Sequence, residues 1–144
     1  MLKNFILLNS FLLTACAAGT PEPDYAHENA DRYAPHVTIV NYQHSDDDSD
    51  DVIAADVYAI DGIKIERDKL EHEITAPPGK HNLILHVVES GDHNYANKFA
   101  NLDLDFRNGE VYKIKAEHDK QNAYTWLVDH TDKELTEKLL ATIE

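Results

Sequence analysis

The stretch NLDLDFRNGEVYKIKAE, residues 101–117, indicates how this chain folds more clearly than any other stretch. Apolar and polar residues alternate on both sides of Asn108-Gly109, and such alternation is typical of strands that bury one face. Asn-Gly is a preferred pair in tight β-hairpin turns, because both positions accept a positive φ angle. We therefore predict a hairpin over residues 101–117. Its apolar positions are Leu102, Leu104, Phe106, Tyr112, Ile114 and Ala116.

Two further turns divide the chain in the same way. Asp61-Gly62 separates two apolar runs, and Pro77-Pro78-Gly79 leads into residues 81–89, which have apolar residues on both faces. A strand with two apolar faces suits the middle of a sheet that is covered on both sides. About seven or eight short strands favour a mainly β fold, an antiparallel Ig-like sandwich. The remaining strands are expected at residues 37–43, 52–60, 71–76 and 124–128.

The C-terminal residues follow a helical pattern instead. Thr131 and Glu134 have the spacing of a capping box, in which each side chain accepts a hydrogen bond from a backbone N–H of the first turn. The apolar residues that follow recur on one helical face, which predicts a short C-terminal α-helix. We expect this face to pack against the sandwich, with binding of a partner as the alternative. It consists of Leu135, Leu139, Leu140 and Ile143.

The N-terminus has the three parts of a secretory signal. Lys3 provides positive charge, Phe5 to Leu13 form an apolar run, and small residues follow. The run is about nine residues long, whereas a membrane-spanning helix needs about twenty. Leu13-Thr14-Ala15-Cys16 resembles the lipobox of bacterial lipoproteins, in which the cysteine becomes the acylated first residue of the mature protein.

This resemblance implies that the chain has three parts. Residues 1–15 are a signal peptide, residues 16–35 a lipidated N-terminus with a flexible tether, and residues 36–144 the sandwich with its C-terminal helix. Cys16 receives a diacylglycerol, and its new amino group receives a further chain such as palmitate. Ala17 at the second mature position implies sorting to the outer membrane. The alternatives are an ordinary cleavage site beside Cys16 and a buried strand of a cytosolic protein.

Three motifs in the β region resemble small surface-layer domains of the PEGA type and related periplasmic lipoproteins. They are Val57 to Gly62, Ala76 to His81 and Gly109 to Ile114, within roughly residues 52–117. In that family an Ile-Asp-Gly hairpin precedes a Pro-Gly-Lys-His turn, and a Gly-x-x-Tyr strand closes the unit. The resemblance implies a PEGA-like sandwich that acts as an adhesive or scaffolding module without chemistry of its own.

Nine histidines and 27 acidic residues supply many groups that bind metal ions. His36 and His44 lie too far apart along one strand to share an ion. The acidic tract is dense in oxygen ligands but lacks the EF-hand pattern, so a solvated loop is its alternative reading. The residues that we consider for a divalent cation are His36, His44, Asp46, Asp47, Asp48, Asp50 and Asp51.

The functional expectation is a non-enzymatic lipoprotein with a structural or binding domain in the cell envelope, where it meets an envelope protein. The lipid uses the lone Cys16, no cofactor motif occurs, and a net charge of −14 opposes nucleic-acid binding. The alternative is a periplasmic metal-binding lipoprotein that uses histidines and the Asp46 to Asp51 loop. A hydrolase would require Ser90 or Ser49 to meet a distant histidine and carboxylate.

Overall fold

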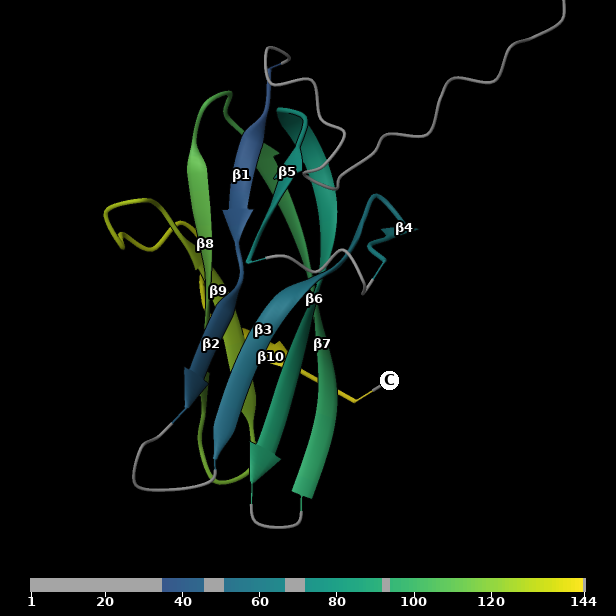
Figure 1. Cartoon of the computed structure of the whole chain (residues 1–144), viewed down its shortest axis with the longest axis vertical. Helices are drawn as coiled ribbons and strands as arrows, with labels where there is room; N and C mark the ends of the chain where they lie inside the picture. Colours follow the sequence, from purple (N-terminus) through teal and green to yellow (C-terminus); the bar gives the residue numbers. More distant parts are fainter. Residues whose placement is uncertain (1–34, 46–50, 67–71, 92–93, 144) are drawn as a thin grey trace, which may run out of the picture.

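A computed structural model gives the structure of this protein at residues 35–45, 51–66, 72–91 and 94–143 (Figure 1). These ranges are mainly β and contain no helix, and hence none long and apolar enough to cross a membrane. The strands are β1 (Val37–Val40), β2 (Tyr42–Ser45), β3 (Val52–Ile60), β4 (Ile63–Lys64), β5 (Glu73–Ala76), β6 (Gly79–Gly91), β7 (Asn94–Phe106), β8 (Val111–His118), β9 (Ala123–Val128) and β10 (Leu139–Ala141).

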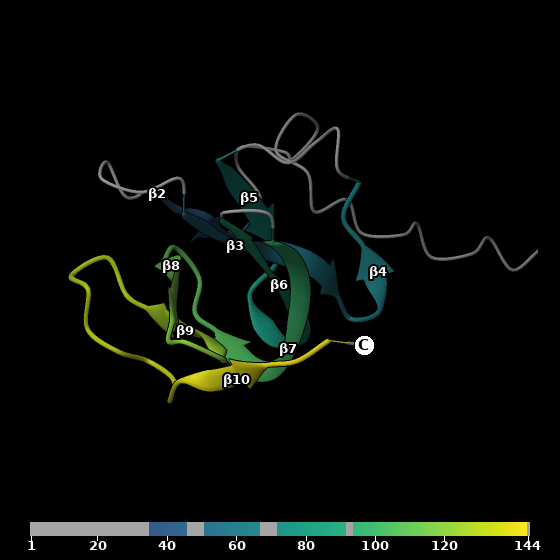
Figure 2. The same cartoon turned by 90° about the horizontal axis from the view of Figure 1, so that it is seen from below.

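The strands form two sheets that face each other, which is the arrangement of a β-sandwich (Figure 2). One sheet has the order β10-β9-β8-β1-β5, and we call it the first sheet. The second sheet has the order β2-β3-β6-β7, with β4 paired to β3. All neighbours are antiparallel except β1 and β8, which run parallel. The expected two-layer β fold is therefore confirmed at the level of class.

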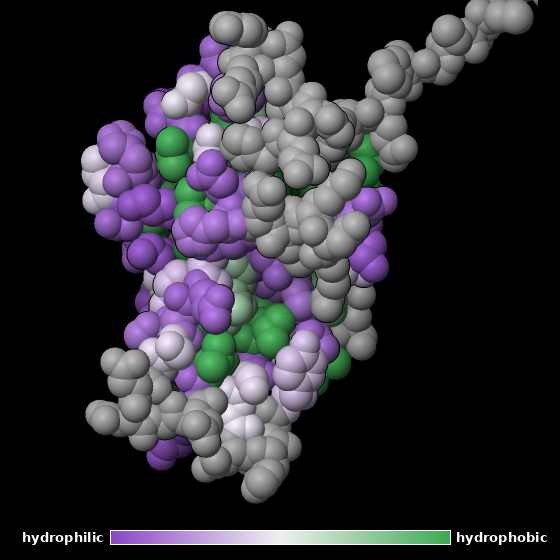
Figure 3. All heavy atoms as spheres, viewed as in Figure 1, coloured by the Kyte–Doolittle hydropathy of each residue, from purple (hydrophilic) through white to green (hydrophobic). Residues whose placement is uncertain are grey.

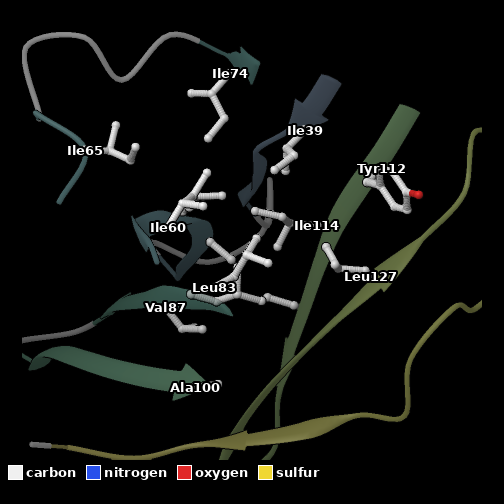
Figure 4. Packing of buried hydrophobic residues seen from close by; sticks show 14 of the residues in the cluster. Ile39, Ile60, Ile65, Ile74, Leu83, Val87, Ala100, Tyr112, Ile114 and Leu127 are labelled. Carbon is white, nitrogen blue, oxygen red and sulfur yellow. The ribbon is translucent and has the colours of Figure 1, made fainter. Parts of the chain in front are cut away.

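The core lies between the sheets and consists of the alternate residues that each strand turns inward (Figure 4). Ile60 and Leu83 of the second sheet and Ile39 of the first are completely buried. Each such side chain contributes about 1.5–3 kcal/mol when it is removed from water. Strand β6 lies between β3 and β7, so the expected place of residues 81–89 in the middle of a sheet is confirmed, but the described residues form only two layers and cover that sheet with a second one on one side.

The predicted hairpin over residues 101–117 is wrong. Strand β7 pairs with β6 over its whole length, whereas β8 pairs with β1 and β9 in the other sheet. The Asn108-Gly109 turn therefore carries the chain across the core, and Gly109 has a φ of +78° there. Alternation shows which face of a strand is buried. It does not show whether two such strands are neighbours in one sheet or belong to two sheets that pack face to face. Phe106 and Tyr112 show this, because their ring centroids are 4.8 Å apart.

The other two predicted turns differ from each other. Asp61-Gly62 joins β3 to β4 in an antiparallel pair, as expected, with φ angles of 51° and 79°. Pro77-Pro78-Gly79 instead leads from β5 in the first sheet to β6 in the second. The expected strand 37–43 is also divided, because the chain changes sheets at Asn41 between β1 and β2.

The predicted C-terminal helix is wrong as well. The Asp129 carboxylate accepts hydrogen bonds from the N–H of Thr131 at 2.7 Å, the Thr131 hydroxyl at 2.6 Å and the N–H of Lys133 at 3.1 Å. These bonds, with the Thr131 hydroxyl foremost, hold the pKa of Asp129 below its ordinary value. The Thr131 hydroxyl is thus engaged outside a helix, and Asp132 has a φ of +64°, which a right-handed helix does not allow.

Only Leu139 and Leu140 of the predicted apolar stripe lie in a strand, β10, while Leu135 and Ile143 lie outside it. Strand β10 pairs with β9, and Ala141 is buried opposite Ala123. The stripe does not form one face, because three of its four members remain exposed. These are Leu135 at 41%, Leu140 at 51% and Ile143 at 72% exposure.

Candidate functional site: the loop-end cleft

Polar side chains replace apolar ones on the inner faces of the strands at one end of the sandwich. Along β6 the inner positions Leu85 and Val87 are buried in the core, and the next inner position is Glu89. Lys98 of β7 and His118 of β8 also follow the inward alternation of their strands. Three ionisable side chains from both sheets therefore converge where a continuous core would place aliphatic ones.

These side chains surround a cavity of about 400 Å³, which we call the loop-end cleft. A volume in this range is typical of sites that bind small molecules. Most of the lining residues come from the end of β6, the start of β7 and the turn between β8 and β9, so both sheets contribute to the cleft. The cleft is lined by Asp51, Glu89, Ser90, Gly91, Ala96, Lys98, His118, Asp119, Lys120 and Gln121.

Glu89 is the centre of the charge network in the cleft. Its Oε2 lies 2.6 Å from Lys98 Nζ, and its Oε1 lies 3.4 Å from His118 Nδ1. The side chains of Glu89 and Lys98 are only 19% and 13% exposed, whereas His118 is 43% exposed. An ion pair that is largely withdrawn from water interacts more strongly than one on the surface, but each partner depends on the other for its solvation.

The rim of the cleft is held in shape by Asp119. Its carboxylate accepts hydrogen bonds from the backbone N–H groups of Gln121 at 3.0 Å and Asn122 at 2.8 Å. The first of these bonds has the largest part in lowering the pKa of Asp119 below its ordinary value. The turn between β8 and β9 therefore keeps an ionised carboxylate at the mouth of the cleft at neutral pH.

Gly91 leaves room for the Asp51 side chain at the wall of the cleft. A Cβ atom at position 91 would overlap the Asp51 carboxylate, while the backbone of Asp51 stays about 4.0 Å away. The small residue thus allows an acidic side chain from the start of β3 to lie against the end of β6.

The predicted site residues are only partly described. Cys16 and its lipobox lie outside the described residues, as do Asp46, Asp47, Asp48, Asp50 and Ser49. His36 and His44 do not meet: the backbone of His36 contacts the turn before β8, and His44 lies on the edge strand β2 opposite Ile53. Asp51 lies in the cleft. In the described ranges no group of three or more His, Cys, Asp or Glu side chains is arranged to hold a metal ion.

Ser90 lines the cleft together with His118 and Glu89, whereas a hydrolase would require the serine to meet a histidine and a carboxylate directly. The structure gives no hydrogen bond between the Ser90 hydroxyl and His118, and Nδ1 of His118 faces Glu89 instead. Nucleophilic catalysis needs the hydroxyl within hydrogen-bond reach of its base. The Ser90 hydroxyl and His118 are therefore not paired as a nucleophile and its base.

Sequence reasoning missed Glu89, Lys98 and His118 as a group. The available signal was the change from Leu85 and Val87 to Glu89 at the inner positions of one strand. To predict the cleft from this change, one would need to know which strand faces β6 across the core. That information is absent from the alternation itself.

A second polar group lies on the outer face of the second sheet. His86 is 2% exposed, and its ring nitrogens lie 2.7 Å from Asn97 Oδ1 and 3.4 Å from Asp56 Oδ1. Its ring stacks on Phe99 at a centroid distance of 5.1 Å. The face shown in Figure 3 is mostly hydrophilic, with apolar side chains visible over β3 and β6. His86 has partners for both nitrogens, so we regard it as structural.

Fold and site together define a two-sheet β protein with a charged cleft at one end. Comparison with protein-family models, curated proteins and solved structures finds no match for this chain. A functional conclusion must therefore come from its own residues and geometry.

Proposed function

We propose that this chain is a lipid-anchored protein of the bacterial cell envelope, sorted to the outer membrane, whose β-sandwich is a non-enzymatic binding domain. Leu13-Thr14-Ala15-Cys16 after a short apolar run supports acylation at Cys16. The two-sheet fold is compatible with the Ig-like and PEGA-like architecture expected from the sequence motifs, and the cleft gives the domain a place to bind a ligand or an envelope partner.

One observation carries the proposal: the chain enters the domain at the end opposite the cleft. The His36 carbonyl accepts a hydrogen bond from Gly109 N–H at 3.0 Å, next to the end of β7 at Phe106. The cleft lies at the other end of β7, which is 13 residues long. At about 3.3 Å per residue such a strand spans about 40 Å. A membrane anchor that precedes His36 would therefore join the domain at the end opposite the cleft.

The charges of the cleft indicate what it binds. A ligand with one charge would pair with either Glu89 or Lys98 and leave the other ion poorly solvated. A zwitterion replaces both halves of the bridge, because its ammonium group binds Glu89 and its carboxylate binds Lys98. We therefore assign free amino acids and short peptides as the ligand class.

Replacement of the lipidated cysteine tests the anchor. Cys16→Ser should abolish incorporation of a labelled fatty acid and release the protein from the membrane fraction, since stable attachment needs more than one acyl chain. Parent protein that stays in the membrane fraction without any acyl label would contradict the proposal.

Thermal unfolding of the full-length protein with added ligands tests the cleft. Amino acids or dipeptides should raise the melting temperature of the parent, because a ligand selective for the folded state stabilises it. Lys98→Met should lose the response, and the matched control Lys64→Met, on β4, should keep it. If zwitterions leave the melting temperature of the parent unchanged while Zn²⁺, Cu²⁺ or Ca²⁺ binds stoichiometrically, the result would support the metal-binding alternative instead.

A further inference from the structure

Strand β7 forms one edge of the second sheet, and the chain already uses part of this edge. Thr142 pairs with Phe99 in an antiparallel bridge. The N–H of Phe99 donates to the Thr142 carbonyl at 2.8 Å, and the N–H of Thr142 donates to the Phe99 carbonyl at 2.9 Å. The backbone groups of Phe99 therefore point away from β6, and the edge accepts an added strand at this residue.

The edge continues beyond Phe99 without a partner in the described part of the chain. The register of β7 against β6 is unbroken from Asn94 to Phe106, so backbone direction alternates regularly. The N–H and C=O groups of Asn101, Asp103 and Asp105 consequently point outward like those of Phe99. No backbone hydrogen bond to these groups is formed by the described residues outside β6. Among the described residues, these three edge positions have no strand partner other than β6.

Side chains on the two faces of this edge differ in character. Asn101, Asp103 and Asp105 are exposed on the outer face, and the Asn82 amide holds the first two through bonds of 2.6 and 2.8 Å. On the inner face Leu102 and Leu104 are only partly buried and pack against the core. A hollow of about 460 Å³ lies at this end and is lined by Asp103, Leu104 and Asp105 of β7 and by Lys80, His81 and Asn82 of β6. Lys80 lies opposite Asp105, so Asp103 is the aspartate without a basic residue opposite it on β6.

We propose that Asn101 to Phe106 is a docking edge for an extended peptide of a partner protein, in which basic and apolar residues alternate. Backbone groups of the peptide pair with those of Asn101, Asp103 and Asp105, as in other strand additions. Its basic side chains lie beside the two aspartates, and its apolar side chains cover Leu102 and Leu104. A net charge of −14 also attracts a basic peptide.

A second copy of this chain does not fit the same edge. Antiparallel pairing of two β7 edges about Asp103 would place that residue opposite its own copy and bring the aspartates of both chains together. Like charges directly opposite each other destabilise a strand pair. The acidic face thus selects a different, basic partner.

Hydrogen exchange on the full-length protein in detergent tests the proposal with a synthetic peptide of four alternating Lys-Val pairs. Binding should slow exchange of the Asn101, Asp103 and Asp105 amides, while those of Leu102 and Leu104, already bonded to β6, change little. A peptide of the same composition with its lysines and valines in two blocks should bind at least tenfold more weakly. Equal binding of the two peptides, or protection elsewhere only, would overturn the proposal.

Two variants separate backbone pairing from charge attraction. Asp103→Pro removes one outward N–H at an edge position where proline is tolerated, and Asp103→Asn with Asp105→Asn removes both charges. Each should weaken binding several-fold, in line with the strength of one backbone hydrogen bond for the first variant and of two cross-strand charge pairs for the second. Glu117→Gln, on the first sheet, removes a charge elsewhere and should have no effect. Unchanged binding by both edge variants, with an intact β circular dichroism spectrum, would refute the docking edge. Neither result bears on the anchor or the cleft.

Discussion

At the scale of single residues, the exposure of an ion pair affects its contribution to stability more than the distance between its charged atoms does. Glu89 and Lys98 are 2.6 Å apart, as are Glu117 and Lys138. The first pair is 13–19% exposed and the second 41–47% exposed. Water screens the second pair and solvates either partner when the other is lost, whereas it does this poorly for the first.

Matched substitutions measure this difference. Glu89→Gln should lower the free energy of unfolding by about 1–3 kcal/mol, because Lys98 keeps a largely buried charge without its partner. Glu117→Gln should cost less than about 1 kcal/mol, as is usual for exposed pairs. Denaturant titration of both variants gives the two values. Equal costs would mean that the cleft is as well solvated as the surface.

At the scale of elements, the turn residues indicate where the chain turns, but they do not indicate which strands become partners. Asp61-Gly62 and Asn108-Gly109 are both turns, but the first joins neighbours in one sheet and the second joins facing sheets. Both allow positive φ angles, which is all that the residue types specify. The predicted helix at the C-terminus is wrong because the spacing of Leu135, Leu139, Leu140 and Ile143 fits a helix as well as a short strand with loops.

Two neighbouring positions in β10 distinguish strand from helix at the C-terminus. Leu140→Lys should change the free energy of unfolding by less than about 0.5 kcal/mol, because this side chain is exposed. Ala141→Lys should lower it by more than about 2 kcal/mol, because it forces a charge into the core. In the predicted helix the order would be reversed, with Leu140 on the packed face. Thermal or denaturant unfolding of the two variants decides between them.

At the scale of the whole molecule, the path of the chain determines where the cleft and the edge lie. The first described residues adjoin the turn after β7, and the cleft adjoins its start. The crossings at Asn41, at Pro77 to Gly79 and at Arg107 to Glu110 bring Glu89 and His118 from different sheets to one end. The same crossings leave β7 at an edge, where Asp103 and Asp105 lie exposed.

The sequence by itself determined the class of fold, the positions of most turns, the buried faces of the strands on either side of Asn108-Gly109 and the lipidation motif that we propose as the anchor. These are local properties, because alternation and turn residues act within a few positions of the chain. Only the tertiary structure decided which strands pair, that the C-terminus is not helical, and that Glu89, Lys98 and His118 meet. Pairing depends on how inner faces fill one shared core, and that packing joins residues far apart in the chain.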